Sequence, residues 1–241
     1  MPKNPQIVIV VPGFWPDHKE LVQSIAVKSG GYLFAGHVLL NTSTHQHWEL
    51  FVLERDPNIA RTLALTGQGS ISMDDVSTIA EHSLVCVLTA EGGSADTAKQ
   101  AMDASAGLLR AGGAAVYVES SGKSHSSGDW VRLSESDKPT APYDAFVALI
   151  NGGTNLYTCG MHNLGLPDAS VDTTAATEDE VRLLRAFNLY RLLESPDLET
   201  GHTFSLTPES TFYRLALLPC ETYEEEDLFF NPFGVWRLSA L

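Results

Sequence analysis

The stretch LVCVLTAEGGSADTAKQAMDASAGLLRAGGAAVYVE, residues 84–119, decides the fold because it alternates strand, helix and strand patterns. Leu84-Val-Cys-Val-Leu88 is an apolar run typical of a buried strand. Ser94 is a good N-cap, and the apolar spacing after it predicts a helix over 95–110. Ala114-Ala-Val-Tyr-Val-Glu119 predicts the next strand. The helix should bury a stripe of small and apolar side chains: Ala98, Ala101, Met102, Ser105, Leu108 and Leu109.

The residues before this stretch predict a strand, a helix and a hairpin. Ile7-Val-Ile-Val-Val11 is typical of a buried strand, and residues 17–28 have apolar side chains at helical spacing. Residues 32–40 and 47–54 resemble two strands joined by a turn-rich segment, so a hairpin is expected there. Two further helices are expected over about 56–66 and 73–82.

The residues after the opening stretch begin with the longest irregular segment, 120–143, which is rich in Ser, Gly, Asp and Pro. Strands are expected at about 144–150 and 155–161, on either side of the turn Asn151-Gly-Gly153. Thr177-Glu-Asp-Glu180 is a capping box that opens the longest helix, about 178–194. Short strands are expected near 203–206 and 211–218, followed by a terminal segment that ends in Val235-Trp-Arg-Leu238.

This order of elements predicts an α+β fold with mixed or antiparallel sheets and helices on one face. Strands that alternate between hairpins and helical crossovers favour two ferredoxin-like, or split βαβ, halves. A doubly wound parallel sheet fits less well, because two hairpins interrupt the alternation. We expect residues 1–241 to form one compact unit, which could divide into lobes 1–82 and 83–241.

The charge of the chain excludes several classes of partner. The 241 residues carry a formal net charge of −15, whereas nucleic-acid-binding proteins and proteins that bind anionic membranes need a basic surface. No run of 18 apolar residues is present, and the first residues lack the pattern of a signal peptide. Three widely spaced cysteines predict free thiols in a reducing compartment. These features predict a cytoplasmic protein.

A catalytic reading rests on four polar side chains near strand ends. Ser121, Ser124 and His125 lie in the Ser- and Gly-rich segment, and His162 follows a later strand. A serine and a histidine could supply a nucleophile and a base if they converged in one pocket. The alternative is that the serines satisfy their own backbone through local hydrogen bonds. The sequence contains no nucleotide-binding or metal-binding motif, so neither a cofactor nor a metal ion is expected.

A binding reading rests on the densest charge run, Glu221-Thr-Tyr-Glu-Glu-Glu-Asp227, which aromatic residues follow directly. An acidic face beside aromatic anchors suits a basic protein partner. The alternative is a solvated loop that precedes a buried aromatic end. The residues predicted to contact a partner are Glu224, Glu225, Glu226, Asp227, Phe229, Phe230 and Trp236.

Three blocks of the sequence resemble a bacterial family of unknown function: Glu81–Leu88, Ala114–Ser126 and Leu156–Asp168. The family carries a Tyr-Thr, Gly-Met and Gly-Leu-Pro-acid signature like the third block, although its last residue is usually Glu where this chain has Asp168. The resemblance implies an α+β fold and a cytoplasmic bacterial setting. Relatives occur beside secretion and toxin–immunity genes, and no activity or catalytic residue is implied.

The leading functional prediction is a non-enzymatic protein-binding factor, such as an immunity or accessory protein, that engages a basic partner. The alternative is a small-molecule-binding protein or a hydrolase that uses residues 119–130 and 159–168. A third reading is a purely structural dimer module, which an exposed apolar patch would favour.

Overall fold

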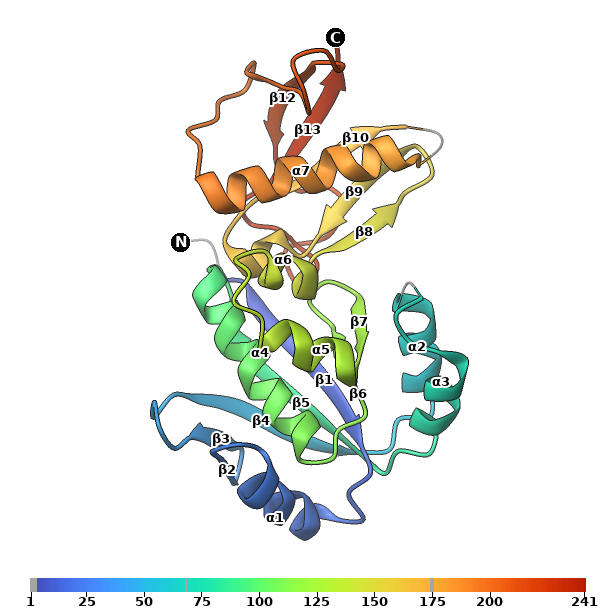
Figure 1. The fold of residues 1–241 in the computed structure, drawn as a ribbon, viewed down its shortest axis with the longest axis vertical. Helices are drawn as coiled ribbons and strands as arrows, with labels where there is room; N and C mark the ends of the chain where they lie inside the picture. Colours follow the sequence, from blue (N-terminus) through green and yellow to red (C-terminus); the bar gives the residue numbers. More distant parts are fainter. Residues whose placement is uncertain (1–3, 68, 174–175) are drawn as a thin grey trace.

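The computed structural model describes residues 4–67, 69–173 and 176–241, and within them two β-sheets lie one above the other along the long axis (Figure 1). Sheet A has seven strands and sheet B has six. Helices pack against both sheets, so the predicted α+β class is confirmed. The strands of sheet A are, in spatial order, β2 (Tyr32–Ala35), β3 (Val38–Asn41), β4 (His47–Glu54), β5 (Leu84–Glu91), β1 (Gln6–Gly13), β6 (Ala115–Val118) and β7 (Lys123–Ser126).

Sheet A is antiparallel, and β1 lies near its centre because the apolar run Ile7–Val11 can be buried on both faces. β1 and β4 are parallel to each other with β5 between them, while β5 and β6 are parallel with β1 between them. This is the strand order of a split βαβ arrangement. The predicted boundary at residues 82/83 falls inside this sheet, since Leu53 of β4 pairs with Val85 of β5.

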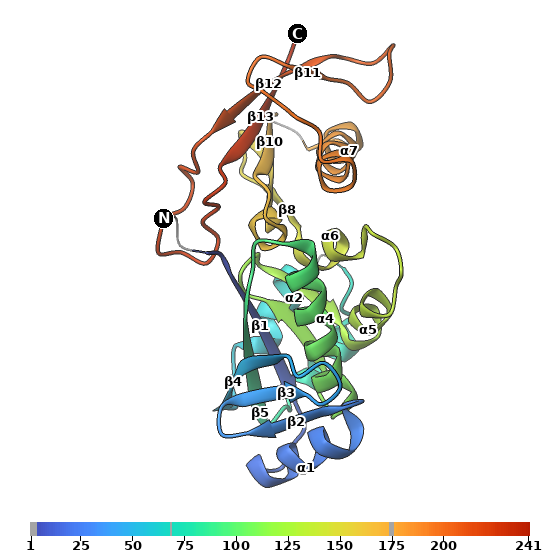
Figure 2. The same cartoon turned by 90° about the vertical axis from the view of Figure 1, so that its left-hand side faces the viewer.

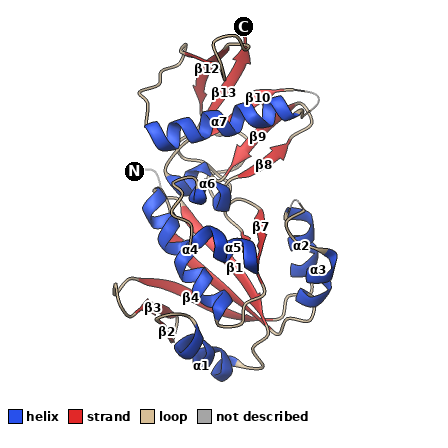
Figure 3. Cartoon of the chain, in the orientation of Figure 1, coloured by secondary structure: helices blue, strands red, loops and turns tan. Residues whose placement is uncertain are grey.

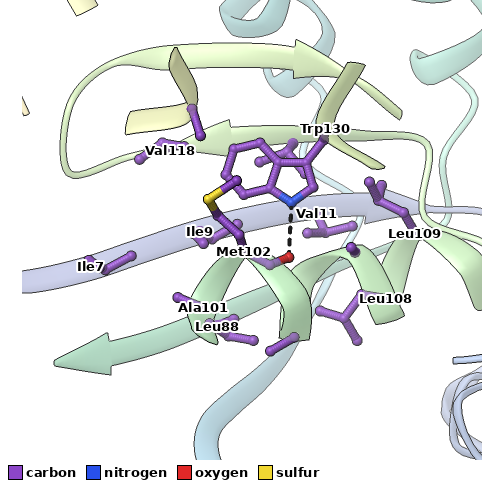
Figure 4. Packing of buried hydrophobic residues seen from close by; sticks show 14 of the residues in the cluster. Ile7, Ile9, Val11, Leu88, Ala101, Met102, Leu108, Leu109, Val118 and Trp130 are labelled. Atoms are coloured by element: carbon purple, nitrogen blue, oxygen red, sulfur yellow. Dashed lines mark hydrogen bonds between the residues drawn. The ribbon is translucent and has the colours of Figure 1, made fainter. Parts of the chain in front are cut away.

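One face of sheet A is covered by the helix predicted over 95–110, which is α4 (Ala95–Arg110). The predicted stripe on α4 is buried, and it packs against Ile7, Ile9 and Val11 of β1. Trp130 completes this layer, because its indole Nε1 donates to the Ser105 Oγ at 2.9 Å. It also donates to the Met102 carbonyl at 3.3 Å (Figure 4). Three shorter helices complete this side of the sheet: α1 (His18–Lys28), α5 (Ser127–Ser134) and α6 (Ala141–Phe146).

The opposite face of sheet A is covered as well, by α2 (Ile59–Thr66) and α3 (Met73–Ile79). Leu63 and Ile79 of these helices pack with Val10 and Val85, which point away from α4. The expectation of helices on one face is therefore wrong for sheet A. The apolar residues that alternate with Ile9 and Val11 need a cover of their own, and the helix pair provides it.

The segment predicted to be irregular, 120–143, contains β7, α5 and the first half of α6 (Figure 3). Its serines support structure: the Ser126 Oγ accepts from the Asp129 backbone N–H at 3.2 Å and caps α5. Trp130 and Phe146 anchor the segment in the core, where both are fully buried. The amino-acid composition of the segment did not reveal these elements, because serine side chains cap helices as readily as they stabilise loops.

Sheet B belongs to the second half of the chain. Its strands are, in spatial order, β11 (Thr203–Phe204), β12 (Tyr213–Leu218), β13 (Val235–Ala240), β10 (Asp168–Asp172), β9 (Asn155–Cys159) and β8 (Ala148–Asn151). β10 and β13 are parallel neighbours with no strand between them. Sheet B therefore lacks the split βαβ order, and two ferredoxin-like halves are not confirmed. The strand β10 was not predicted from the sequence.

The helix predicted over 178–194 is α7 (Glu178–Glu194), which opens with the expected capping box at Thr177. It covers one face of sheet B through Leu183, Leu184 and Phe187. Figure 2 shows α7 on that side and the chain between β12 and β13 on the other side, beside the start of β1. None of the helices among the described residues is long and apolar enough to cross a membrane.

The two sheets meet at a single 3₁₀ turn, η1 (Met161–Leu164), which glycines enclose. Gly160 has φ +117°, and a Cβ atom there would lie 2.2 Å from the Phe146 carbonyl oxygen. Gly165 has φ +80°, and its Cβ would lie 2.2 Å from the Gly93 carbonyl oxygen. The Gly93 N–H donates to the Asn163 carbonyl at 3.1 Å. Only glycine permits this close backbone approach between sheet A with its helices and sheet B with α7, which are called the two lobes from here on.

Candidate functional site

The first predicted site, around Ser124 and His125, serves mainly to hold α6. Lys123 and His125 alternate along β7 and therefore share a face of the strand. The Lys123 Nζ donates to the carbonyls of Asp144 at 2.6 Å and Val147 at 2.8 Å. The His125 Nε2 lies 2.8 Å from the Ala145 carbonyl. Both side chains thus satisfy carbonyls at the C-terminal end of a helix, which are otherwise unpaired.

The electrostatics of these two side chains follow from their burial. Desolvation and, to a smaller extent, the charge on Lys123 lower the pKa of His125 to about 4. Burial also lowers the pKa of Lys123 to about 8, and the Asp144 carboxylate opposes that shift. His125 is therefore neutral near pH 7, so its Nε2 carries a proton that it donates to Ala145. A ring nitrogen committed in this way is not free to activate a nucleophile.

Replacing Lys123 with methionine should lower the free energy of unfolding by about 1–3 kcal/mol, because two helix-end carbonyls lose their partner. Urea unfolding followed by circular dichroism measures the change. The exposed Lys138, in the loop between α5 and α6, provides the matched control Lys138→Met. Equal stability of the two variants would contradict the capping role of Lys123.

The four residues of the catalytic reading do not form one site. The Ser124 hydroxyl bonds to the Thr66 hydroxyl of α2. Ser121 is fully buried beside Gly160, and its Oγ has no hydrogen-bond partner among the described residues. His162 lines a different cavity from Ser124 and His125. Within the described part of the chain, no hydrogen bond joins any of these serines to either histidine.

The second predicted site contains a cavity of about 250 Å³ between the lobes. The acidic loop, residues 219–234 between β12 and β13, contributes Glu225, Glu226 and Asp227 to its lining. His162 of η1 also lines it, together with the first described residues, Asn4 to Gln6. The structure thus brings His162 together with three acidic residues that the sequence assigned to a separate site. No sequence signal identified Asn4–Gln6 as lining residues, because they meet this cavity only through the folded position of the acidic loop.

His162 is the most deeply buried polar group in this cavity, with 1% of its surface exposed. Neither ring nitrogen has a hydrogen bond of normal geometry to another described residue. Burial lowers the pKa of His162 to about 4, although the nearby carbonyls of Ser120 and Leu228 oppose the shift. The ring is therefore neutral at pH 7 and has one nitrogen able to accept a hydrogen bond.

The predicted partner residues divide between surface and core. Glu224, Glu225, Glu226 and Asp227 are exposed, and Phe230 is half-buried in the cavity wall. Trp236 is 5% exposed and packs on Phe187 in the core of sheet B, so its assignment to a partner surface is wrong. It lies on β13 with its side chain toward α7, a direction set by strand register.

Phe229 also has a structural role, because it fixes the acidic loop to sheet A. Its ring lies 3.4 Å from where a Cβ on Gly122 would stand, in the turn between β6 and β7. It also contacts the Tyr223 ring at 5.3 Å between centroids, and the Tyr223 hydroxyl pairs with the Tyr157 hydroxyl at 2.9 Å. These contacts hold the loop at the junction of the lobes.

A buried polar network anchors the other end of the acidic loop. Asn231 donates to the Asp168 carboxylate at 2.6 Å and to the Leu166 carbonyl at 3.1 Å. Asp168 also accepts from the Met161 N–H at 3.1 Å and from the Thr158 hydroxyl at 3.3 Å. Arg191 of α7 lies close enough for its charge to lower the pKa of Asp168, but desolvation dominates and raises that pKa to about 6.

The signature residues of the third sequence block therefore have structural explanations. Thr158, Met161 and Asp168 belong to the buried network, and Gly160 and Gly165 permit the contact between the lobes. Among the described residues, no group of three His, Cys, Asp or Glu side chains could hold a metal ion. The candidate binding site is therefore the acidic cavity together with the loop that forms it.

The fold and the site define a two-sheet α+β protein with an acidic cavity at the junction of its lobes. Residues 157–239 match a family described as a domain of unknown function, DUF4261. The match covers about a third of the chain, including η1, α7, most of sheet B and the whole acidic loop. No curated protein and no solved structure matches this chain. The similarity supports the predicted likeness to a family of unknown function.

Proposed function

We propose that this protein binds a basic protein partner through the acidic loop and acts without catalysis, as an immunity or accessory factor does. The observation that carries the proposal is the gathering of Glu225, Glu226 and Asp227 around one cavity. Among the described residues that line it, none is a lysine or an arginine. Carboxylates concentrated in this way attract a positively charged surface and orient it.

Apolar side chains beside the acidic residues give the surface a second element of recognition. A neighbouring cavity of about 470 Å³ shares Glu225, Phe230 and Pro232 with the first one. Leu217, Leu218 and Phe233 line it, and each is about two-fifths exposed. Protein interfaces combine an apolar centre with a polar rim, which is the arrangement along this loop. The resemblance to a bacterial family found beside toxin–immunity genes supports the same cytoplasmic role.

The triple variant Glu224→Gln, Glu225→Gln, Glu226→Gln should weaken binding of a nona-lysine peptide by about tenfold at low salt, because three rim charges are removed. Isothermal titration calorimetry at two salt concentrations measures both the affinity and its screening. The matched control replaces three other exposed glutamates of the second half with glutamine: Glu194, Glu199 and Glu209. If both triple variants lose affinity equally, binding is non-specific and the proposed surface is wrong.

A further inference from the structure

The cavity of about 470 Å³ between the end of β12 and the acidic loop collects large apolar side chains at the surface. We call this cavity the loop groove. Leu217, Leu218 and Phe233 line it, and they are 43%, 42% and 38% exposed. Phe230 and Pro232 continue the same wall. Apolar side chains that lie together in the open are typical of a surface that a binding partner covers.

The fold holds the loop groove in shape at the edge of the second lobe. Leu218 pairs with Val235 where the acidic loop leaves and re-enters sheet B. Gly234 permits this close turn, because its φ is +89° and a Cβ there would lie 2.4 Å from the Leu218 carbonyl oxygen. Asn231 fixes the returning chain through its bond to the buried Asp168. A groove built in this way binds without first ordering its walls, which favours affinity.

The size of the loop groove suits one large side chain and the backbone that carries it. An apolar cavity of roughly 150 Å³ already holds a benzene molecule, and this groove is about three times as large. Phe230 and Phe233 offer aromatic rings against which an inserted side chain can pack. Burial of one large apolar side chain raises an affinity by a factor of at least about ten.

The charge around the loop groove selects what flanks the inserted side chain. Glu221, Glu224 and Glu225 line the groove, and none of its described lining residues is a lysine or an arginine. A second copy of this chain would bring its own net charge of −15, and an anionic membrane is negative as well, so both are repelled. A polypeptide segment with basic residues beside its apolar anchor is attracted instead.

We propose that the loop groove receives one large apolar side chain of the partner, from a segment that carries lysine or arginine on both sides of that side chain. The inference rests on the proposed function and deepens it, because it adds the residue that is inserted to the charge that is attracted. The acidic rim orients the segment, and the groove distinguishes a segment with an anchor from one that is merely basic.

Three peptides test the inference without any knowledge of the partner. The first has a phenylalanine between two runs of four lysines, the second has a serine between the same runs, and the third has a phenylalanine between two runs of four serines. Isothermal titration calorimetry should give the lysine–phenylalanine peptide an affinity at least about tenfold higher than either of the others. Only that peptide offers both the anchor and the charges.

A cysteine in the wall of the loop groove reports where the peptide binds. Cys220 lines the groove and is half-buried, whereas Cys86 and Cys159 are buried. Iodoacetamide should therefore alkylate Cys220 first, as mass spectrometry of the digested protein detects. A saturating amount of the lysine–phenylalanine peptide should slow this reaction at least about fivefold, because the reaction requires access to the thiol. The lysine–serine peptide should leave the rate nearly unchanged.

A double variant removes apolar surface from the groove wall. Leu217→Thr, Leu218→Thr keeps β-branched residues in β12, and it should reduce the preference for the lysine–phenylalanine over the lysine–serine peptide to less than about threefold. The matched control makes the same change at two exposed leucines of sheet A, Leu33 and Leu53, and should keep the full preference. Circular dichroism checks that both variants fold, and the Cys220 measurement needs no variant.

Several results would overturn the inference. Equal affinity of the two lysine peptides, or a Cys220 reaction that the lysine–phenylalanine peptide does not slow, would exclude an inserted anchor. Equal affinity would leave the acidic surface intact, since nona-lysine and the triple glutamine variant test it separately, whereas the proposed function itself fails if no lysine peptide binds. A serine–phenylalanine peptide that binds equally well would exclude the basic flanks. Self-association, or binding to phosphatidylcholine vesicles, that the double variant abolishes would assign the groove to a second copy or to lipid.

Discussion

Replacement of Gly160 with alanine is expected to cost at least about 4 kcal/mol of the free energy of unfolding, a large fraction of the roughly 5–15 kcal/mol that stabilises a folded protein. The new Cβ would lie 2.2 Å from the Phe146 carbonyl oxygen and 2.8 Å from the Ser121 Cβ. Neither neighbour can move easily, since one is backbone and the other is fully buried. The φ of +117° adds strain, because L-residues rarely adopt it.

The hairpin turn between β8 and β9 supplies the matched control, Gly153→Ala. Gly153 also has a positive φ, +87°, but nothing lies within 4 Å of where its Cβ would stand. The free energy of unfolding of this variant should fall by only about 1–2 kcal/mol, the cost of placing alanine at a positive φ. Thermal unfolding of both variants separates the steric contribution from the conformational one. If Gly160→Ala is no less stable than Gly153→Ala, the close contact between the lobes is absent.

Replacement of Asp168 with alanine should cost about 3–5 kcal/mol, because it removes the acceptor at the centre of a buried network. The Met161 N–H and the Asn231 amide would each lose a hydrogen bond, and Arg191 would lose the nearest negative charge. Since Asn231 fixes the acidic loop to sheet B, the variant should also expose residues 219–234 to proteolysis at temperatures below global unfolding. Urea unfolding and limited proteolysis measure the two effects.

The same carboxyl should make stability depend on pH. Its pKa of about 6 in the folded protein lies above the ordinary value of about 3.9. The folded state therefore binds a proton on Asp168 more tightly than the unfolded state does. The stability that this protonation contributes is fully present below about pH 4. It is lost as pH rises to about 6, by up to about 1.4 kcal/mol per pH unit. Asp168→Asn has no titrating carboxyl, so this slope should be missing from its stability profile.

The comparison between wild type and Asp168→Asn isolates one titrating group, because every other group is shared. Asp168→Asn should also be more stable than Asp168→Ala, since one amide oxygen remains to accept a hydrogen bond. Identical pH slopes between pH 4 and 6 in wild type and Asp168→Asn would show that Asp168 is not the buried group described. Near-UV circular dichroism during the titration detects any loss of tertiary packing.

Local signals in the sequence predicted many of the elements closely. The helices at 95–110 and 178–194 were predicted with the observed bounds, because their caps and apolar spacing are encoded within a few residues. The hairpin turn at 151–153 was predicted for the same reason. Segment 120–143 was misjudged, since its anchor Trp130 acts through distant partners such as Met102. Local composition carries no information about such contacts.

The candidate site was predicted in pieces. The charge run Glu221–Asp227 identified the acidic loop, because clustered charge is visible in the sequence itself. The position of His162 in the acidic cavity was not predicted. Nothing in the neighbouring sequence indicates that it shares a cavity with residues more than sixty positions away. Trp236 was assigned to the surface because an aromatic residue beside acidic ones looks the same in sequence whether it points outward or into a core.

By itself, the sequence determined the α+β class, the bounds of the capped helices and the concentration of acidic charge in the last third of the chain. These properties depend on interactions between residues a few positions apart or on composition alone. Only the tertiary structure decided that the strands of residues 6–126 form one sheet, and that His162 meets the acidic loop. Both outcomes depend on long-range packing, in which strand register and close glycine contacts select one arrangement among many that local preferences allow.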